Sequence, residues 1–303
     1  MELLRFQRRF LHPRYWLLWL GLGFWALLVQ LPYPLLRLLA RLLGWLLWWV
    51  TPARRHIAAT NIKLCFPELS EREKQRLLRR NYDSTAMALF ESGMSWFWPK
   101  WRLRRMYRIE GQENLPQDGG PGALMMALHF TTVDIGGAFI GQETAMTAMY
   151  RPHKNPVYDF VQRWGRERHS AGAIIARDDV RVMLRALKRG ERVWYAPDQD
   201  YGIKRSVFAP LFGVSAATVT ATAKFARAGN AQVIPFIQTR LPWCRGYELV
   251  IYPPLDDFPS GDEVADATRI NQYVEARIRE QPEQYLWTHR RFKTRPPGEA
   301  KLY

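Results

Sequence analysis

The first fifty residues are strongly apolar and predict a membrane region. Residues 15–31, YWLLWLGLGFWALLVQL, hold one polar side chain, Gln30, and as a helix would reach ~25 Å, the short end of what crosses a bilayer core. Residues 34–50 follow, with Arg37 and Arg41 on one helical face and Leu and Trp on the others. This second pattern favours a helix that lies in the interface between lipid and water.

Two alternatives apply to this region. A cleaved signal peptide is disfavoured because the sequence after Gln30, LPY, contains no small-residue cleavage site and because the apolar run is rich in Trp. The segment 34–50 could instead be a buried helix that packs on the globular part of the chain.

The next region is polar and helix-prone. Ser70 and Glu73 have the spacing of a capping box, which predicts a helix over residues 71–96. The run EGQENLPQDGGPG at 110–122 is typical of turns. We therefore expect a membrane anchor and interfacial helix over 1–51 and a globular domain over 52–303, with a helical lead-in to about residue 110 and an α/β core over 123–303.

From residue 123 onward, short apolar runs alternate with helical patterns. Strands are expected at 123–128, 144–150, 173–176, 192–196, 232–238 and 247–252. Helices are expected at 133–141, 156–169, 180–189, 216–228 and 262–280. This alternation predicts an α/β fold with a mixed central sheet and helices on both faces.

Charge narrows the classes of partner. The formal net charge is +16, so the surface should attract nucleic acid, anionic lipid or an acidic protein. Cys65 and Cys244 are too few for a disulfide framework and have no partners at metal-ligand spacing. We therefore expect neither a metal ion nor a cofactor.

Polar side chains follow four of the expected strands, at the edge where α/β sheets bind their ligands. These residues are His129, Arg151, the group Arg177, Asp178 and Asp179, and the pair Asp198 and Asp200. Loop and capping preferences explain some of them, but the coincidence of four clusters favours an active site.

His129 and Asp134 are the leading catalytic candidates, although composition alone gives such a His-to-acid spacing in roughly one of two chains like this one. Asp134 should lie in the first turn of the helix, where the helix dipole keeps a carboxylate ionised. If it contacts one imidazole nitrogen, the other can accept a proton as a general base. Thr131 and Thr132 are expected to cap that helix, and Gly136 and Gly137 to let it pack closely on the sheet or to serve as ordinary packing glycines.

Further candidates are assigned less directly. Arg151 and Arg166 could contact a phosphate or an oxyanion, and Asp198 and Asp200 could orient these arginines or their own loop, or have a purely structural role in the turn. His289, Arg290 and Arg291 belong to a basic C-terminal cluster that could hold acceptor phosphates, face a lipid surface or simply be solvated. Glu91, flanked by apolar residues, could lie against an arginine of the site.

Several longer blocks resemble the late acyltransferases of lipid A biosynthesis. They are HFTTVD, YRPHKNP, the run from RWGRERHSAG to WYAPDQDYG, VFAPLFGV and HRRFKTRP, together with NIKLCFPELSE near the N-terminus. HFTTVD and PDQDYG are more similar to the branch that adds a lauroyl or related chain first than to the myristoyl branch. Leu128 precedes His129 where glycerolipid enzymes commonly have Asn, which also favours the lipid A branch.

This resemblance implies a fold like that of glycerolipid acyltransferases and His129 and Asp134 as the catalytic dyad. It implies an acyl carrier protein thioester as donor and a Kdo-bearing, phosphorylated lipid A precursor as acceptor. It also implies an inner-membrane protein with its catalytic domain at the cytoplasmic face.

Two rival functions remain. One is a glycerolipid acyltransferase that uses the same dyad on lysophosphatidate. The other is a membrane-anchored basic protein that binds nucleic acid, which we disfavour because the arginines are spread along the chain and no nucleic-acid-binding motif is present.

Overall fold

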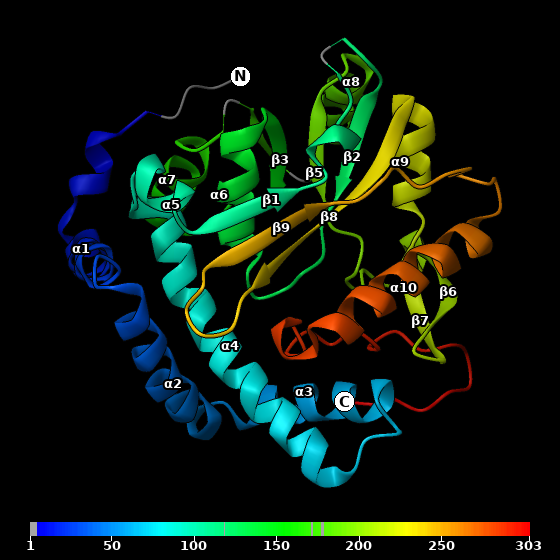
Figure 1. Ribbon diagram of the computed structural model, residues 1–303, viewed down its shortest axis with the longest axis horizontal. Coiled ribbons are helices and arrows are strands. Elements are labelled where there is room, and N and C mark those ends of the chain that lie inside the picture. The colour runs from blue at the N-terminus through cyan, green and yellow to red at the C-terminus, as the bar shows by residue number, and fades with distance from the viewer. Residues whose placement is uncertain (1–4, 118, 171, 177–178) are drawn as a thin grey trace.

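A seven-stranded mixed sheet forms the centre of the protein (Figure 1). The structure is a computed structural model that describes residues 5–117, 119–170, 172–176 and 179–303. The strand order is β1-β9-β8-β2-β5-β3-β4, and all neighbours are parallel except β8 and β9. The strands are β1 (Tyr107–Glu110), β2 (Gly122–Met126), β3 (Met146–Tyr150), β4 (Ile174–Ala176), β5 (Arg192–Tyr195), β8 (Ala231–Arg240) and β9 (Tyr247–Ile251).

Helices cover both faces of this sheet because its central strand is apolar on both sides. Every residue of β2 is buried, as in a strand enclosed between two layers. Ala123 and Met125 pack with Phe139 of α6, whereas Leu124 and Met126 pack on the opposite face. The helices of the first face are α2 (Tyr33–Val50) and α6 (Val133–Glu143), and those of the second are α3 (Pro52–Cys65), α8 (Val180–Lys188), α9 (Ala221–Gly229) and α10 (Glu263–Glu280). Helix α4 (Glu71–Phe97) contributes its C-terminal half to the first face and its N-terminal half to the second. The remaining α-helices are α1 (Trp16–Leu28), α5 (Lys100–Arg104) and α7 (Pro156–Glu167).

The expected α/β architecture is confirmed, as are the six expected strands to within a few residues. The capping box that begins α4 is also present, since the Ser70 hydroxyl accepts from the Glu73 N–H and the Glu73 carboxylate accepts from the Ser70 N–H. The domain boundaries remain a prediction, although the sheet already begins with β1, inside the expected helical lead-in.

The helix expected over 216–228 is wrong in its first part. Val214–Val219 forms β7, which pairs in an antiparallel hairpin with β6 (Ser206–Leu211), and α9 starts only at Ala221. The turn between the strands has positive φ at Phe212 and Gly213, a conformation that the helical pattern does not predict. The alanines of Val214–Val219 are typical of a helix, whereas its valines and threonine are β-branched residues typical of a strand.

Helix α2 runs alongside α4 on the outside of the domain, and α1, also on the outside, touches α4 (Figure 1). Helix α1 is shorter than the expected segment, and its 13 residues reach only ~20 Å. In the described part of the chain no single helix has the length and hydropathy to cross a bilayer, whereas α2 and α3 together pass that test but are bent by 98°. The transmembrane anchor therefore remains a prediction.

Helix α2 packs on the domain along one face, as one of the two alternatives for it expected, and its place in a lipid interface remains a prediction. Leu36, Ala40 and Gly44 are buried, and an added Cβ at Gly44 would lie 2.8 Å from the Asp83 carboxylate of α4. Its other face is exposed and apolar, with Trp45 and Trp49 more than 60% exposed. One side of α2 therefore packs on the domain while the other is open to a partner.

Candidate active site

A cavity of about 590 Å³ opens at the carboxyl edge of the sheet. The residues that follow β2, β3 and β5 line its mouth, at the carboxyl edge, and they include His129, Arg151 and Gln199. Its walls farther in are mostly apolar, with Met146 and Ala148 of β3 and Trp194 of β5. The position of the cavity is the one expected for a ligand site in a largely parallel sheet.

His129 is held at this edge by Asp198, which lies in the loop that follows β5. The imidazole Nδ1 lies 2.6 Å from Oδ1 of Asp198, and the backbone N–H of His129 donates to Oδ2 at 2.9 Å. The Asp198 side chain is fully buried, whereas the His129 side chain keeps 20% of its surface exposed. The carboxylate thus fixes both the backbone and the ring of His129.

The charge state of Asp198 determines the tautomer of His129. Burial by itself would raise the pKa of Asp198, but the charge of His129 and the hydrogen bonds from it outweigh burial and hold that pKa below its usual value. An ionised carboxylate only accepts hydrogen bonds, so Nδ1 carries the proton. Nε2 is then free to take a proton from a bound hydroxyl.

Asp134 lies in the first turn of α6, as expected, but it pairs with Arg166 of α7. The Arg166 Nη2 is 2.7 Å from Oδ1, and the Ser92 hydroxyl of α4 donates to Oδ2 at 2.7 Å. Burial would raise the pKa of Asp134, but Arg166 and Ser92 outweigh it and keep the pKa below its usual value. Among the described hydrogen bonds none joins Asp134 to His129, so the expected direct contact is wrong and Asp198 takes that place.

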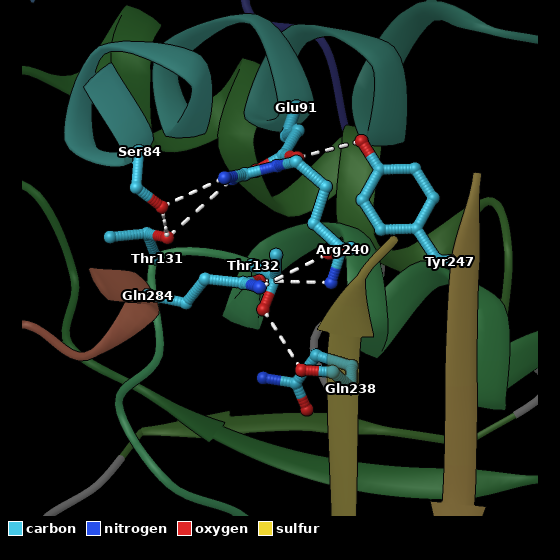
Figure 2. A network of polar contacts seen from close by, with 8 residues as sticks. All are labelled: Ser84, Glu91, Thr131, Thr132, Gln238, Arg240, Tyr247 and Gln284. Atoms are coloured by element: carbon cyan, nitrogen blue, oxygen red, sulfur yellow. Dashed lines mark hydrogen bonds and ion pairs between the residues drawn. The ribbon is translucent and has the colours of Figure 1, made fainter. Parts of the chain in front are cut away.

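A buried ion pair lies beside Thr131 and Thr132 (Figure 2). Arg240 at the end of β8 binds Glu91 of α4 in a bidentate way, with Nε to Oε1 at 2.5 Å and Nη2 to Oε2 at 2.6 Å. Arg240 also donates to the Ser84 hydroxyl, which lies 2.7 Å from the Thr131 hydroxyl. Tyr247 donates to Glu91 at 2.6 Å. Glu91 thus lies against an arginine, as expected, but one in the core and not one that lines the cavity.

The two threonines after His129 are fixed by this network and do not cap α6. Thr132 occupies the N-cap position without a side-chain cap bond, and its hydroxyl donates to the Gln238 carbonyl. The Thr131 N–H donates to the Gln284 carbonyl at 2.7 Å. The capping expectation is therefore wrong for both side chains, because the Thr131 hydroxyl binds Ser84 of α4 and the Thr132 hydroxyl binds the Gln238 carbonyl of β8.

The described residues contain no group of three His, Cys, Asp or Glu side chains that could hold a metal ion. The polar residues present instead form two carboxylate-centred pairs, His129 with Asp198 and Arg166 with Asp134. Such a site can remove a proton and stabilise negative charge beside an apolar cavity.

Comparison with known proteins assigns the family. Residues 3–294 match the family described as Bacterial lipid A biosynthesis acyltransferase. The chain belongs to this family. It is therefore an acyltransferase, and the non-enzymatic alternative falls away.

The curated relatives of this acyltransferase align over nearly the whole chain. The lipid A biosynthesis lauroyltransferase and the lipid A biosynthesis palmitoleoyltransferase of Escherichia coli K12 are each 44% identical over 99% of this chain and 98% of theirs. The myristoyltransferase of the same organism is 28% identical over 98% of this chain and 93% of its own. The expected greater similarity to the lauroyl branch is confirmed.

A solved structure, the 1-acyl-sn-glycerophosphate acyltransferase PlsC from Thermotoga maritima, aligns with a TM-score of 0.37 at 18% identity, over 82% of this chain and 95% of that one. Such a score supports no conclusion about a shared fold. The expected likeness to glycerolipid acyltransferases therefore stays a prediction.

The other polar residues that the sequence predicts at the carboxyl edge of the sheet differ in burial and in their partners. Arg151 is exposed and lines the cavity. Asp200 is buried and accepts from the backbone and hydroxyl of Thr294 and from the Gly202 N–H, so it orients its own loop and the C-terminal segment but no cavity arginine. Arg177 and Asp178 lie outside the described residues.

The residues of the C-terminal basic cluster also differ in burial. Arg291 is 2% exposed and donates to the Ala217 carbonyl, Thr218 and Asn271, so the expected phosphate contact is wrong for this residue. His289 accepts from the Asp200 N–H through Nε2, and burial, followed by the nearby charge of His129, lowers its pKa to about 4. Arg290 is exposed, and its phosphate contact remains a prediction.

The Asp198 carboxylate is expected to be the group that orients the catalytic imidazole. His129→Ala should lower the rate of acyl transfer by about 10²- to 10⁴-fold, the usual contribution of a general base. Asp198→Asn should lower it by about a hundredfold or more, because the amide no longer favours the Nδ1–H tautomer or stabilises the imidazolium. Rates of acyl transfer by the purified variants provide the measurement. An Asp198→Asn enzyme with the parental rate would contradict the assignment.

The buried ion pair is expected to matter for stability. Glu91→Gln and Arg240→Met each leave a buried group without its partner and should lower the free energy of unfolding by about 3–5 kcal/mol, measured by urea denaturation. The double variant Glu91→Met, Arg240→Met should recover much of that loss. As a control, Glu263→Gln removes one side of the exposed Lys224–Glu263 pair and should cost less than about 1 kcal/mol. Single variants as stable as that control would refute the role of the pair.

Proposed function

We propose that this acyltransferase moves a fatty acyl chain from an acyl carrier protein thioester to a 3-hydroxyacyl hydroxyl of a Kdo-bearing lipid A precursor, which gives a secondary acyl chain. The observation that carries this proposal is the His129 imidazole, oriented by the buried Asp198 carboxylate at the mouth of a largely apolar cavity. Membership of the lipid A biosynthesis family supports the choice of acceptor.

The reaction follows from the free Nε2 of His129. Nε2 takes the proton of the acceptor hydroxyl, and the oxygen attacks the thioester carbonyl carbon. The new C–O bond forms as the C–S bond breaks, and the imidazolium returns its proton to the departing thiolate. No nucleophilic side chain of the enzyme is required, because the acceptor supplies the oxygen.

Arg166 is our candidate for the contact with the oxyanion. It lines the cavity, and its guanidinium is held by Asp134, which is itself fixed by Ser92. A donor positioned before the reaction stabilises developing charge without reorganisation. The pair Asp134 and Arg166 therefore has a role beside the His129 base: Asp134 positions the arginine that stabilises the transition state.

The two partners fit the charge of the protein. A net charge of +16 attracts an acidic carrier protein and a multiply phosphorylated lipid. The exposed Arg151 at the cavity mouth and Arg290 near the C-terminus are candidates for contacts with acceptor phosphates. Both substrates would be met at the cytoplasmic face of the bacterial inner membrane.

Helices α1 and α2 would bind the protein to that membrane. Their outer faces expose large apolar side chains to an extent that a folded domain rarely leaves uncovered. On α1 these are Leu17, Leu20, Phe24 and Leu27, and on α2 they are Leu38, Leu42, Trp45 and Trp49. Both helices pack on α4, which also reaches the site through Ser92, so the lipid surface and the cavity share one support.

The substrate proposal is tested by two acceptors offered in parallel. Purified enzyme with lauroyl-loaded acyl carrier protein should add one lauroyl group to a Kdo-bearing lipid A precursor, detected by mass spectrometry, and His129→Ala should not. Acylation of lysophosphatidate but not of the lipid A precursor would show that the enzyme is a glycerolipid acyltransferase and would overturn the proposal.

The membrane-binding face is tested with vesicles that contain anionic lipid. The triple variant Leu17→Ser, Leu20→Ser, Phe24→Ser should partition into them at least about 100-fold more weakly, since each fully buried large apolar side chain contributes about 1.5–3 kcal/mol. Trp243→Ser with Val264→Ser removes apolar side chains that are 90% and 50% exposed elsewhere and should leave partitioning unchanged. Equal loss in both sets would argue against a specific face.

A further inference from the structure

The cavity has an apolar arm that runs along β3 toward the far edge of the sheet. Met146, Ala148 and Tyr150 line it from one face of the strand, and Met149, which alternates with them, also reaches the cavity. Met146 packs with Ala138 and Phe139, so this face is the one that α6 covers. The part of the arm between Tyr150, at the carboxyl edge, and Met146 spans ~13 Å.

Helix α6 forms one wall of this arm. Val133, Asp134, Gly137 and Ala138 line the cavity, which is one stripe of a helix. Because α6 starts at the carboxyl edge, Gly137 lies one turn, ~4.5 Å, farther in than Asp134. The position is therefore past the charged groups and inside the apolar part.

The glycines of α6 differ in what a side chain would meet. A Cβ at Gly136 would lie 2.6 Å from Gln238, and one at Gly141 would lie 3.1 Å from Ser170, so both glycines serve close packing. A Cβ at Gly137 would meet no atom within 4 Å. Glycine weakens a helix relative to alanine, and at this position no neighbouring atom requires it. The space that a side chain at residue 137 would occupy is part of the open cavity.

We propose that Gly137 determines which acyl chain lengths the enzyme accepts from its donor. This inference rests on the proposed function and adds a specificity residue to it. Relatives named for a lauroyl and for a palmitoleoyl group are equally similar to this chain, at 44% identity, so overall similarity does not set chain length and local residues of the cavity must. A single arm between helices fits a donor that carries one chain, whereas the acceptor brings several.

The test varies side-chain size at residue 137. Gly137→Met should place an unbranched side chain in the arm and exclude long chains by overpacking. In competition between decanoyl, lauroyl, myristoyl and palmitoyl carrier protein thioesters, the ratio of decanoyl to palmitoyl product should rise by at least about tenfold relative to the parent. Gly137→Ala should shift it in the same direction by about two- to threefold, because it adds one methyl group.

Gln142→Met is the matched control, since it adds methionine to the same helix at a position that does not line this cavity. It should keep the parental profile. An unchanged profile in both Gly137 variants, or an equal loss of rate for all chain lengths, would overturn the proposal. The proposal would also be overturned if the Gly137 variants changed the preference for the acyl chains of the acceptor and not the preference for those of the donor.

A second readout does not require transfer to lipid A. Free decanoate and free palmitate should both raise the Tm of the parent, whereas only decanoate should raise the Tm of Gly137→Met. If the parent acylates no lipid A precursor, the proposed function fails while this measurement still tests Gly137. Equal protection of Gly137→Met by both fatty acids would refute the role of this residue. If Gly137→Met does not fold, the chain-length profile of Gly137→Ala provides the test. A Gly137→Ala profile equal to that of the parent would then refute the proposal.

Discussion

The ion pair between Glu91 and Arg240 joins the longest helix of the protein to the end of strand β8. Both side chains are buried, so neither charge has water to solvate it and each requires the other. Burial by itself would lower the pKa of Arg240, but Glu91 outweighs burial and raises it, which keeps the guanidinium charged. The pair therefore favours the register of α4 that brings the carboxylate to the guanidinium.

That register positions the rest of the site. Ser84 lies two turns before Glu91 on α4 and binds Thr131, two residues after His129, while Ser92 is adjacent to Glu91 and binds Asp134. One helix thus holds both ends of the loop that leads from the imidazole to the first turn of α6. The same helix receives α2 on its other side, where Gly44 allows close approach to Asp83. The apolar outer helices and the catalytic loop are consequently fixed to one rigid element.

The sequence predicted well the features that depend on local pattern. The buried strands, the capping box at Ser70 and the placement of Asp134 in a first helical turn follow from periodicity and from the preferences of single residues. It could not predict which carboxylate meets the imidazole, because Asp198 is 69 positions from His129 and only the pairing of β2 with β5 brings their loops together. The burial of Arg291 could not be predicted either, because its partners come from β7 and α10, which are distant in the sequence. A basic run in a sequence gives charge but not the direction of each side chain.

The two aspartates of the site show how much this distinction matters for mechanism. The spacing of His129 and Asp134 suggests a dyad, yet α6 directs the Asp134 carboxylate to Arg166 and Ser92, and leaves the imidazole to Asp198. A base and a cation are thereby held by separate carboxylates. Because Asp198 holds the imidazole and Asp134 holds Arg166, a proton that moves onto His129 is stabilised by the ionised Asp198 and leaves the proposed oxyanion contact of Arg166 unchanged. With both carboxylates held at the edge of the sheet, the apolar arm beside α6 is the part of the cavity that we propose to distinguish one hydrocarbon chain from another.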